Sequence, residues 1–91
     1  MKTVILVATG RVQGVGFRYM TKYRADLLKI YGIVKNQEDG TVYIEANGPE
    51  EKLNRFIEVV RASPSPSGNV THLEVIENPA IKLRDKFTIT D

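Results

Sequence analysis

Apolar positions along this chain repeat with two different periods, and each change of period marks the boundary of a predicted element. Thr3 to Thr9 is apolar and β-branched and is followed by a glycine, which predicts a strand. The segment from Phe17 to about Lys29 repeats with the period of a helix instead. The residues that would share one face of this helix are Phe17, Met20, Thr21, Ala25 and Leu28.

Tyr31 to Gln37 and Thr41 to Ala46 are two further predicted strands, joined by Glu38-Asp39-Gly40. An Asp-Gly pair between such runs favours a hairpin with a type I′ turn, in which both central residues have positive φ. A second helix is predicted after Gly48, with Pro49 as its first helical residue and two acids near the positive end of its dipole. Its apolar face follows the i, i+3, i+4, i+7 rule at Leu53, Phe56, Ile57 and Val60.

The last third of the chain contains a loop and two strands. Ser, Pro and Gly fill residues 63–68, and Val70 to Glu77 follows as a strand. After Asn78-Pro79, Phe87 to Thr90 alternates with a period of two and predicts a short terminal strand. The order βαββαβ plus a terminal strand predicts an α+β fold, the ferredoxin-like split βαβ sandwich, with an antiparallel sheet and two helices on one face. We expect residues 1–91 to form a single domain.

Composition narrows the possible chemistry without identifying it. The sequence contains no cysteine, which excludes disulfide scaffolds, thiol catalysis and cysteine metal sites. The formal net charge of +2, with basic and acidic residues interspersed, permits an anionic ligand but does not imply nucleic acid. The apolar run Val4–Ala8 is too short for a signal peptide or a membrane span, so we expect a cytoplasmic protein.

The glycine-rich segment between the first strand and the first helix is the strongest candidate for a functional site. Gly10 to Gly16 contains three glycines, so we expect no regular element there. Glycines let successive backbone N–H groups face one anion, and the first turn of the helix adds its own N–H groups and dipole. Arg18 would lean back over this loop, where its guanidinium can bind two phosphate oxygens. From spacing alone, the alternative is an ordinary turn with a solvated arginine.

Known nucleotide-binding patterns do not fit this loop. It lacks the Gly-Lys-Ser/Thr ending of nucleotide P-loops, and Tyr19 stands where the dinucleotide pattern requires its third glycine. A nucleotide site is therefore not expected.

Asn36 is the second candidate, because asparagine is uncommon in strands and this one ends the second predicted strand. Its alternative role is that of a turn residue bonded to its own hairpin. In a βαβ unit, however, the two strands run parallel, and their carboxyl ends lie at the same edge of the sheet. We therefore expect Asn36 to lie beside the glycine loop.

Two segments of the chain resemble the acylphosphatase family. Gly10–Arg18, GRVQGVGFR, is similar to that family's signature Gly-x-Val-Gln-Gly-Val-x-Phe-Arg. Gly32–Val42, followed by Gly48, is similar to the family's second motif, and the family's length and element order cover the entire chain. The resemblance implies the ferredoxin-like fold and the hydrolysis of small acyl phosphates to a carboxylate and inorganic phosphate.

The resemblance also assigns roles to individual residues. It implies that Arg18 and Asn36 are catalytic, and we expect Arg18 to hold the phosphate while Asn36 orients the attacking water. The expected partner is a small acyl phosphate, with no cofactor, no metal, no nucleic acid and no membrane, and we expect a monomer. The phosphate-binding backbone falls on Arg11, Val12, Gln13, Gly14, Val15 and Gly16.

The chain departs from the family pattern at two positions. Ile33 stands where an aromatic residue is usual, which we interpret as a packing change. Lys29 stands where the first helix usually ends in glycine. If Lys29 keeps the left-handed conformation of such a cap, its side chain costs about 1 kcal/mol, and we expect Lys29→Gly to raise stability.

Two other functions share features with this sequence. RNA-recognition domains have the same βαββαβ order, but they stack bases on aromatic residues of the third strand, where this chain has only Tyr43 and an acid. A non-catalytic anion sensor would use the same loop, and the presence of both Arg18 and Asn36 argues against it. His72, the only histidine, is expected to be a strand residue and not a catalyst.

Overall fold

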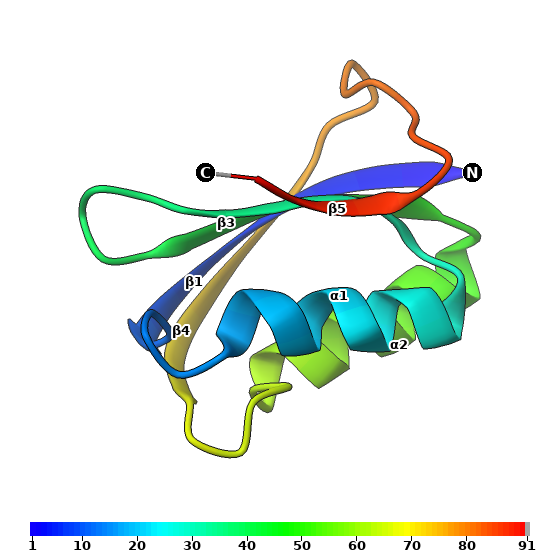
Figure 1. Ribbon diagram of the computed structural model, residues 1–91. Helices are drawn as coiled ribbons and strands as arrows, with labels where there is room; N and C mark the ends of the chain where they lie inside the picture. Colours follow the sequence, from blue (N-terminus) through cyan, green and yellow to red (C-terminus); the bar gives the residue numbers. More distant parts are fainter. Residues whose placement is uncertain (91) are drawn as a thin grey trace.

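The computed structural model describes residues 1–90 and has two layers, a five-stranded sheet and two helices that cover one of its faces (Figure 1). The strands lie in the order β4-β1-β3-β2-β5. This arrangement confirms the predicted ferredoxin-like fold with a terminal strand added at one edge. The elements are β1 (Lys2–Arg11), α1 (Phe17–Leu28), β2 (Tyr31–Asn36), β3 (Val42–Gly48), α2 (Glu50–Arg61), β4 (Asn69–Glu77) and β5 (Phe87–Thr90).

The sheet is mixed, whereas we expected it to be antiparallel throughout. β1 through β4 pair in antiparallel fashion, but β5 pairs with β2 in parallel, with Gly32 opposite Phe87. Residues 78–86 lead from β4 at one edge of the sheet to β5 at the other edge, on the side of the sheet opposite the helices (Figure 1).

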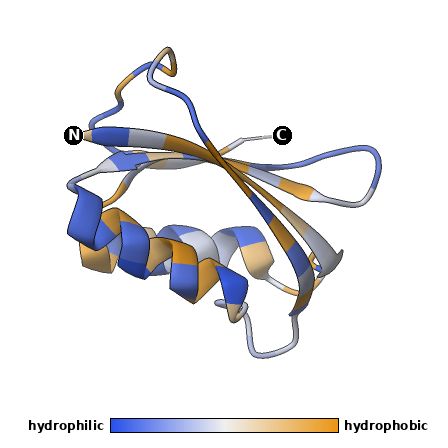
Figure 2. Cartoon of the chain, turned by 180° about the vertical axis from the view of Figure 1, so that it is seen from behind, coloured by the Kyte–Doolittle hydropathy of each residue, from blue (hydrophilic) through white to orange (hydrophobic). Residues whose placement is uncertain are grey.

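The core lies between the sheet and the helices, where each inner strand contributes every second residue (Figure 2). In β1, for example, Val4, Leu6 and Ala8 are at most 3% exposed. The rings of Phe56 and Phe87 meet edge to face, with centroids 5.9 Å apart, which attaches β5 to α2. The buried residues of the two helices are Phe17, Thr21 and Ala25 in α1 and Leu53, Phe56 and Val60 in α2.

The end of β1 differs from the prediction in a way that matters for the glycine loop. β1 continues to Arg11 and pairs with β4 through an irregular register between Thr9 and Gly10. A Cβ built on Gly10 would lie 2.3 Å from the carbonyl oxygen of Asn69. The first of the three glycines therefore permits close approach of β4, and the irregular loop begins only after Arg11.

The β2–β3 hairpin forms as predicted, but the type I′ turn was wrong. Gly40 has φ 91°, whereas Asp39 is not among the residues with positive φ. The Gly40 N–H donates to the Gln37 carbonyl at 3.2 Å, and the Gln37 N–H donates to the Thr41 carbonyl at 2.9 Å. A turn of this kind, with a left-handed glycine in third position, is the common three-residue hairpin loop.

The C-terminus of α1 and the N-terminus of α2 bear on two of the predictions. Lys29 caps α1 in the left-handed conformation, with φ 58° and ψ 43°, so the condition on which the Lys29→Gly prediction depends is met. The Lys29 N–H donates to the backbone carbonyl of Asp26 at 3.2 Å, and the Ile30 N–H donates to the backbone carbonyl of Ala25 at 2.9 Å. These two hydrogen bonds form a Schellman motif. Pro49 is the N-cap of α2 and not its first helical residue, because its ψ of 142° is extended.

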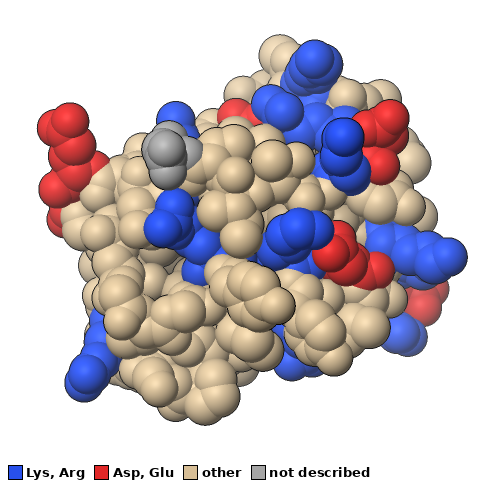
Figure 3. Space-filling model, in the orientation of Figure 1, with Lys and Arg blue, Asp and Glu red and all other residues tan. Residues whose placement is uncertain are grey.

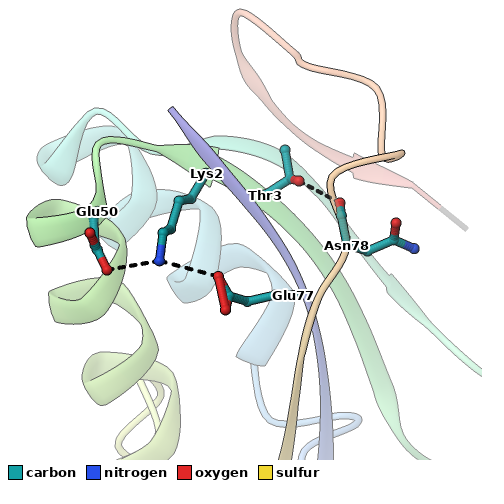
Figure 4. A network of polar contacts seen from close by, with 5 residues as sticks. All are labelled: Lys2, Thr3, Glu50, Glu77 and Asn78. Carbon is teal, nitrogen blue, oxygen red and sulfur yellow. Dashed lines mark hydrogen bonds and ion pairs between the residues drawn. The ribbon is translucent and has the colours of Figure 1, made fainter.

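The start of β1 is held by a polar network (Figure 4). The Lys2 ammonium lies 2.8 Å from the Glu50 carboxylate and 3.2 Å from that of Glu77, which joins β1 to α2 and β4. The hydrogen bond and charge of Glu50 and Glu77 raise the pKa of Lys2, and Lys2 in turn lowers the pKa of Glu50. The Thr3 hydroxyl donates to the Asn78 carbonyl. This network fixes one end of β1, and the glycine loop follows the other.

Candidate active site

A pocket of about 200 Å³ lies at the N-terminus of α1, beside the ends of β2 and β5. Pockets for drug-sized ligands are roughly 300–1,000 Å³, so this one suits a small anion better than a nucleotide. It brings Arg18 and Asn36 together, as the chain topology predicted. The residues that line it are Val12, Gly14, Gly16, Phe17, Arg18, Tyr19, Asn36 and Ile89.

The N-terminus of α1 forms one wall of this pocket. Gly16 is the N-cap, with φ 76°, and its carbonyl accepts the Met20 N–H at 3.0 Å. The helix has no side-chain cap and no acidic residue in its first turn. The first N–H groups of a helix have no intrahelical partner, and here no capping side chain takes them. An anion in the pocket would meet these N–H groups and the positive end of the helix dipole.

Arg18 lies in the first turn of α1 and is partly buried. Its Nη1 donates to the Thr90 carbonyl oxygen at 3.3 Å, so the end of β5 helps to position the guanidinium. This contact explains why the terminal strand matters for the site. A guanidinium beside open backbone N–H groups makes this part of the pocket electropositive.

Asn36 is the last residue of β2 and lies opposite Val42 of β3. Ala8 of β1 lies opposite the same Val42, so β1 and β2 flank β3 on its two sides, run parallel to each other and end at the same edge of the sheet. The Asn36 Oδ1 is buried and has no hydrogen-bond partner among residues 1–90. This oxygen therefore does not accept a hydrogen bond from its own hairpin, and an unpaired amide oxygen of this kind costs about 1–3 kcal/mol. Asn36 lines the pocket, so its side chain lies beside any ligand that enters there.

The other predicted loop residues divide into two groups. Val12, Gly14 and Gly16 line the pocket, whereas Arg11, Gln13 and Val15 do not. Arg11 belongs to β1, where it pairs with Asn69 and is exposed.

Gln13 connects the loop to the β2–β3 hairpin. Its Nε2 donates to the carbonyl oxygens of Gln37 at 2.8 Å and Thr41 at 2.9 Å. Gln37 directly follows Asn36, so this side chain joins the glycine loop to the strand that carries Asn36.

Sequence reasoning missed three large side chains at the pocket, of which Phe17 was predicted only as a core residue. Tyr19, 70% exposed, follows Arg18 in α1, and Ile89, 36% exposed, comes from β5. The position of Tyr19 could have been inferred from its place in the first helical turn. No local signal marks Ile89, because the residues of β5 do not show which strand β5 pairs with.

Residues 1–90 show neither a candidate metal site, which would need a group of three or more His, Cys, Asp or Glu side chains, nor a helix long and apolar enough to cross a membrane. His72 lies in β4, opposite Thr9, and is exposed. On the face that Figure 3 shows, Lys and Arg side chains lie in separate groups with Asp and Glu between them.

Comparison with known proteins gives a consistent result. The chain matches the family model described as Acylphosphatase over residues 4–89. It is 56% identical over 91 residues to the acylphosphatase of Lactiplantibacillus plantarum, covering all of both chains. It is 54% identical over 85 residues to that of Pediococcus pentosaceus, covering 93% of this chain and 94% of the relative. The crystal structure of acylphosphatase from Bacillus subtilis superposes with a TM-score of 0.94 at 42% identity, covering all of both chains.

Proposed function

Since this chain belongs to the acylphosphatase family and is a hydrolase of acyl phosphates, we propose that Arg18, Asn36 and the amides of the glycine loop carry out the reaction. The observation that supports this assignment is their meeting in one small pocket at an uncapped helix N-terminus. The substrate is a small acyl phosphate, of which the pocket admits the phosphate and its nearest atoms.

Binding of the phosphate is the task of Arg18 and the backbone. Phosphoryl transfer depends mainly on positioning and on stabilising charge over the equatorial oxygens. The guanidinium and the N–H groups from Val12 to Gly16 and the first turn of α1 supply that stabilisation from fixed positions, so they do not need to reorganise during the reaction. The predicted cradle from Arg11 to Gly16 is retained in this proposal, with Gly14 and Gly16 contributing the amides nearest the pocket.

Asn36 orients the attacking water. Its side-chain amide, which lines the pocket, forms a hydrogen bond with the water, whose oxygen then attacks phosphorus directly as the bond to the acyl oxygen breaks. The carboxylate is a good leaving group and requires little acid catalysis. An amide is no useful base, so the proton passes from the water to a phosphate oxygen of the substrate. The step uses only groups of the chain, water and substrate, without a metal.

Hydrolysis of benzoyl phosphate at neutral pH tests these roles. We expect Arg18→Ala to lose turnover by about a hundred- to thousandfold, the usual cost of removing one such electrostatic contact. Asn36→Ala should lower kcat while inhibition by inorganic phosphate is largely kept. Arg24→Ala is the matched control, because Arg24 is a partly buried arginine of the same helix that does not line the pocket.

Three outcomes would contradict the proposal. Normal turnover by Arg18→Ala would show that the guanidinium is not required. Loss of activity in the presence of a chelator would show that the reaction requires a metal ion. Phosphate binding without turnover in the unmodified protein would indicate a non-catalytic anion sensor instead.

A further inference from the structure

We propose that Ser65 is a positioning residue of this active site, which orients the peptide group between Val15 and Gly16 so that the Gly16 N–H faces the bound phosphate. The proposal rests on the function proposed above, in which loop amides hold the phosphate. It adds a residue from a distant segment that neither contacts substrate nor lines the pocket.

Ser65 belongs to the serine loop, residues 63–68, which connects α2 to β4. Figure 1 places this loop at the same end of the molecule as the glycine loop, and the two are joined by a hydrogen bond. Ser65 is only 3% exposed, and its Oγ donates to the Val15 carbonyl oxygen. A buried hydroxyl that donates its hydrogen bond to one loop carbonyl fixes the direction of that carbonyl.

The direction of the Val15 carbonyl determines the direction of the next N–H. A peptide group is planar and trans, so the carbonyl of Val15 and the N–H of Gly16 point in opposite directions. Gly16 lines the pocket and Val15 does not. With the carbonyl held toward Ser65, away from the pocket, the Gly16 N–H is held toward it. The backbone at Gly16 has φ 76°, a left-handed conformation that glycine adopts without the strain that a side chain would add.

The serine loop is itself well fixed, as a positioning element must be. The Ser65 carbonyl accepts hydrogen bonds from the Ser63 hydroxyl at 2.9 Å and from the Gly68 N–H at 3.0 Å. Ser63 has φ 68° although it precedes a proline, a conformation that persists only where its surroundings impose it. A Cβ on Gly68 would lie 3.1 Å from the Arg11 carbonyl oxygen, so the loop packs closely against the end of β1.

Titration with inorganic phosphate, followed by the ¹H–¹⁵N signal of Gly16, tests the orientation directly. In the unmodified protein we expect the Gly16 amide to shift as phosphate binds. In Ser65→Ala we expect this shift to be lost or strongly reduced. We also expect the Kd for phosphate to rise about tenfold, the effect of misplacing one hydrogen-bond donor to a charged group.

Two controls separate positioning from general stability. Ser67→Ala changes an exposed serine of the same loop and should bind phosphate like the unmodified protein. Val60→Ala removes core volume in α2, away from the pocket, and should lower Tm without changing the Gly16 shift. If Ser65→Ala fails to fold, Ser65→Cys keeps nearly the same shape with a weaker donor and should give intermediate values.

The outcomes are distinguishable. A normal phosphate Kd and a normal Gly16 shift in Ser65→Ala, or in Ser65→Cys if only that variant folds, would overturn the positioning role. A change in the phosphate Kd and in the Gly16 shift no larger than the change in Val60→Ala would also overturn the positioning role. Failure of the proposed function has a different signature, namely normal turnover by Arg18→Ala.

Discussion

Replacing Lys29 by glycine should make this protein more stable. Lys29 has φ 58° and ψ 43°, a conformation in which the Cβ of an L-residue approaches the following carbonyl and costs roughly 1–2 kcal/mol. Glycine avoids that cost but gains conformational freedom in the unfolded chain, which offsets about 0.4–1 kcal/mol. The Lys29 side chain is exposed, and both backbone hydrogen bonds of the cap persist in the variant. The net expectation is about 0.5–1 kcal/mol of added stability.

Calorimetry and urea unfolding measure this difference. For a domain of this size, 1 kcal/mol corresponds to a shift in Tm of about 4–8 °C, so Lys29→Gly should melt roughly 2–8 °C higher. The control is Lys29→Ala, which removes the amine and its favourable interaction with the helix C-terminus but keeps Cβ. We expect Lys29→Ala to match the unmodified protein or fall slightly below it. Equal Tm values for the glycine and alanine variants would refute the argument, because Cβ strain would then make no measurable contribution.

Two further predictions concern the hairpin and the open face of the sheet. Gln13→Leu should reduce turnover of benzoyl phosphate about tenfold, because the glycine loop is no longer held to the hairpin beside Asn36. The control is Gln37→Leu, which loses only a hydrogen bond to the Thr41 hydroxyl. Equal turnover rates for the two variants would contradict the prediction. Burial, then the hydrogen bond to Glu45, raises the pKa of Tyr43 to about 12 from an ordinary value of 10. Because the folded pKa lies above the unfolded one, this stabilisation is complete below pH 10 and is lost as the pH rises to 12. The urea midpoint should therefore fall less steeply over that interval in Tyr43→Phe, and equal slopes would show that Tyr43 does not contribute.

Most secondary structure could be predicted because it depends on neighbouring residues. The face of α2 follows a strict helical period, and three of its four predicted residues are fully buried, with Ile57 partly so. Errors occurred where one segment meets another. Gly10 was assigned to the loop because the sequence does not show that β4 approaches it within a few ångströms.

The candidate site could be predicted in part. Gly14, Gly16 and Arg18 are close along the chain, and their grouping follows from a strand, a glycine turn and a helix start. Asn36 could be added because the βαβ topology places two strand ends at one edge. The family pattern marked Lys29 as a position where glycine is usual, and the structure shows that Lys29 has the left-handed conformation of such a cap.

The sequence by itself determined the order of the elements, the family and the two residues with the strongest case for catalysis, because these depend on local periodicity and on contiguous motifs. Only the tertiary structure decided what surrounds those residues. The partners of Gln13, Val15 and Arg18 come from segments 24, 50 and 72 residues away. Such contacts depend on strand register and on how loops pack against one another, and neither is encoded in the residues of one segment alone. The sequence therefore predicts where a phosphate would bind, and the fold shows which contacts hold the predicted binding groups in place.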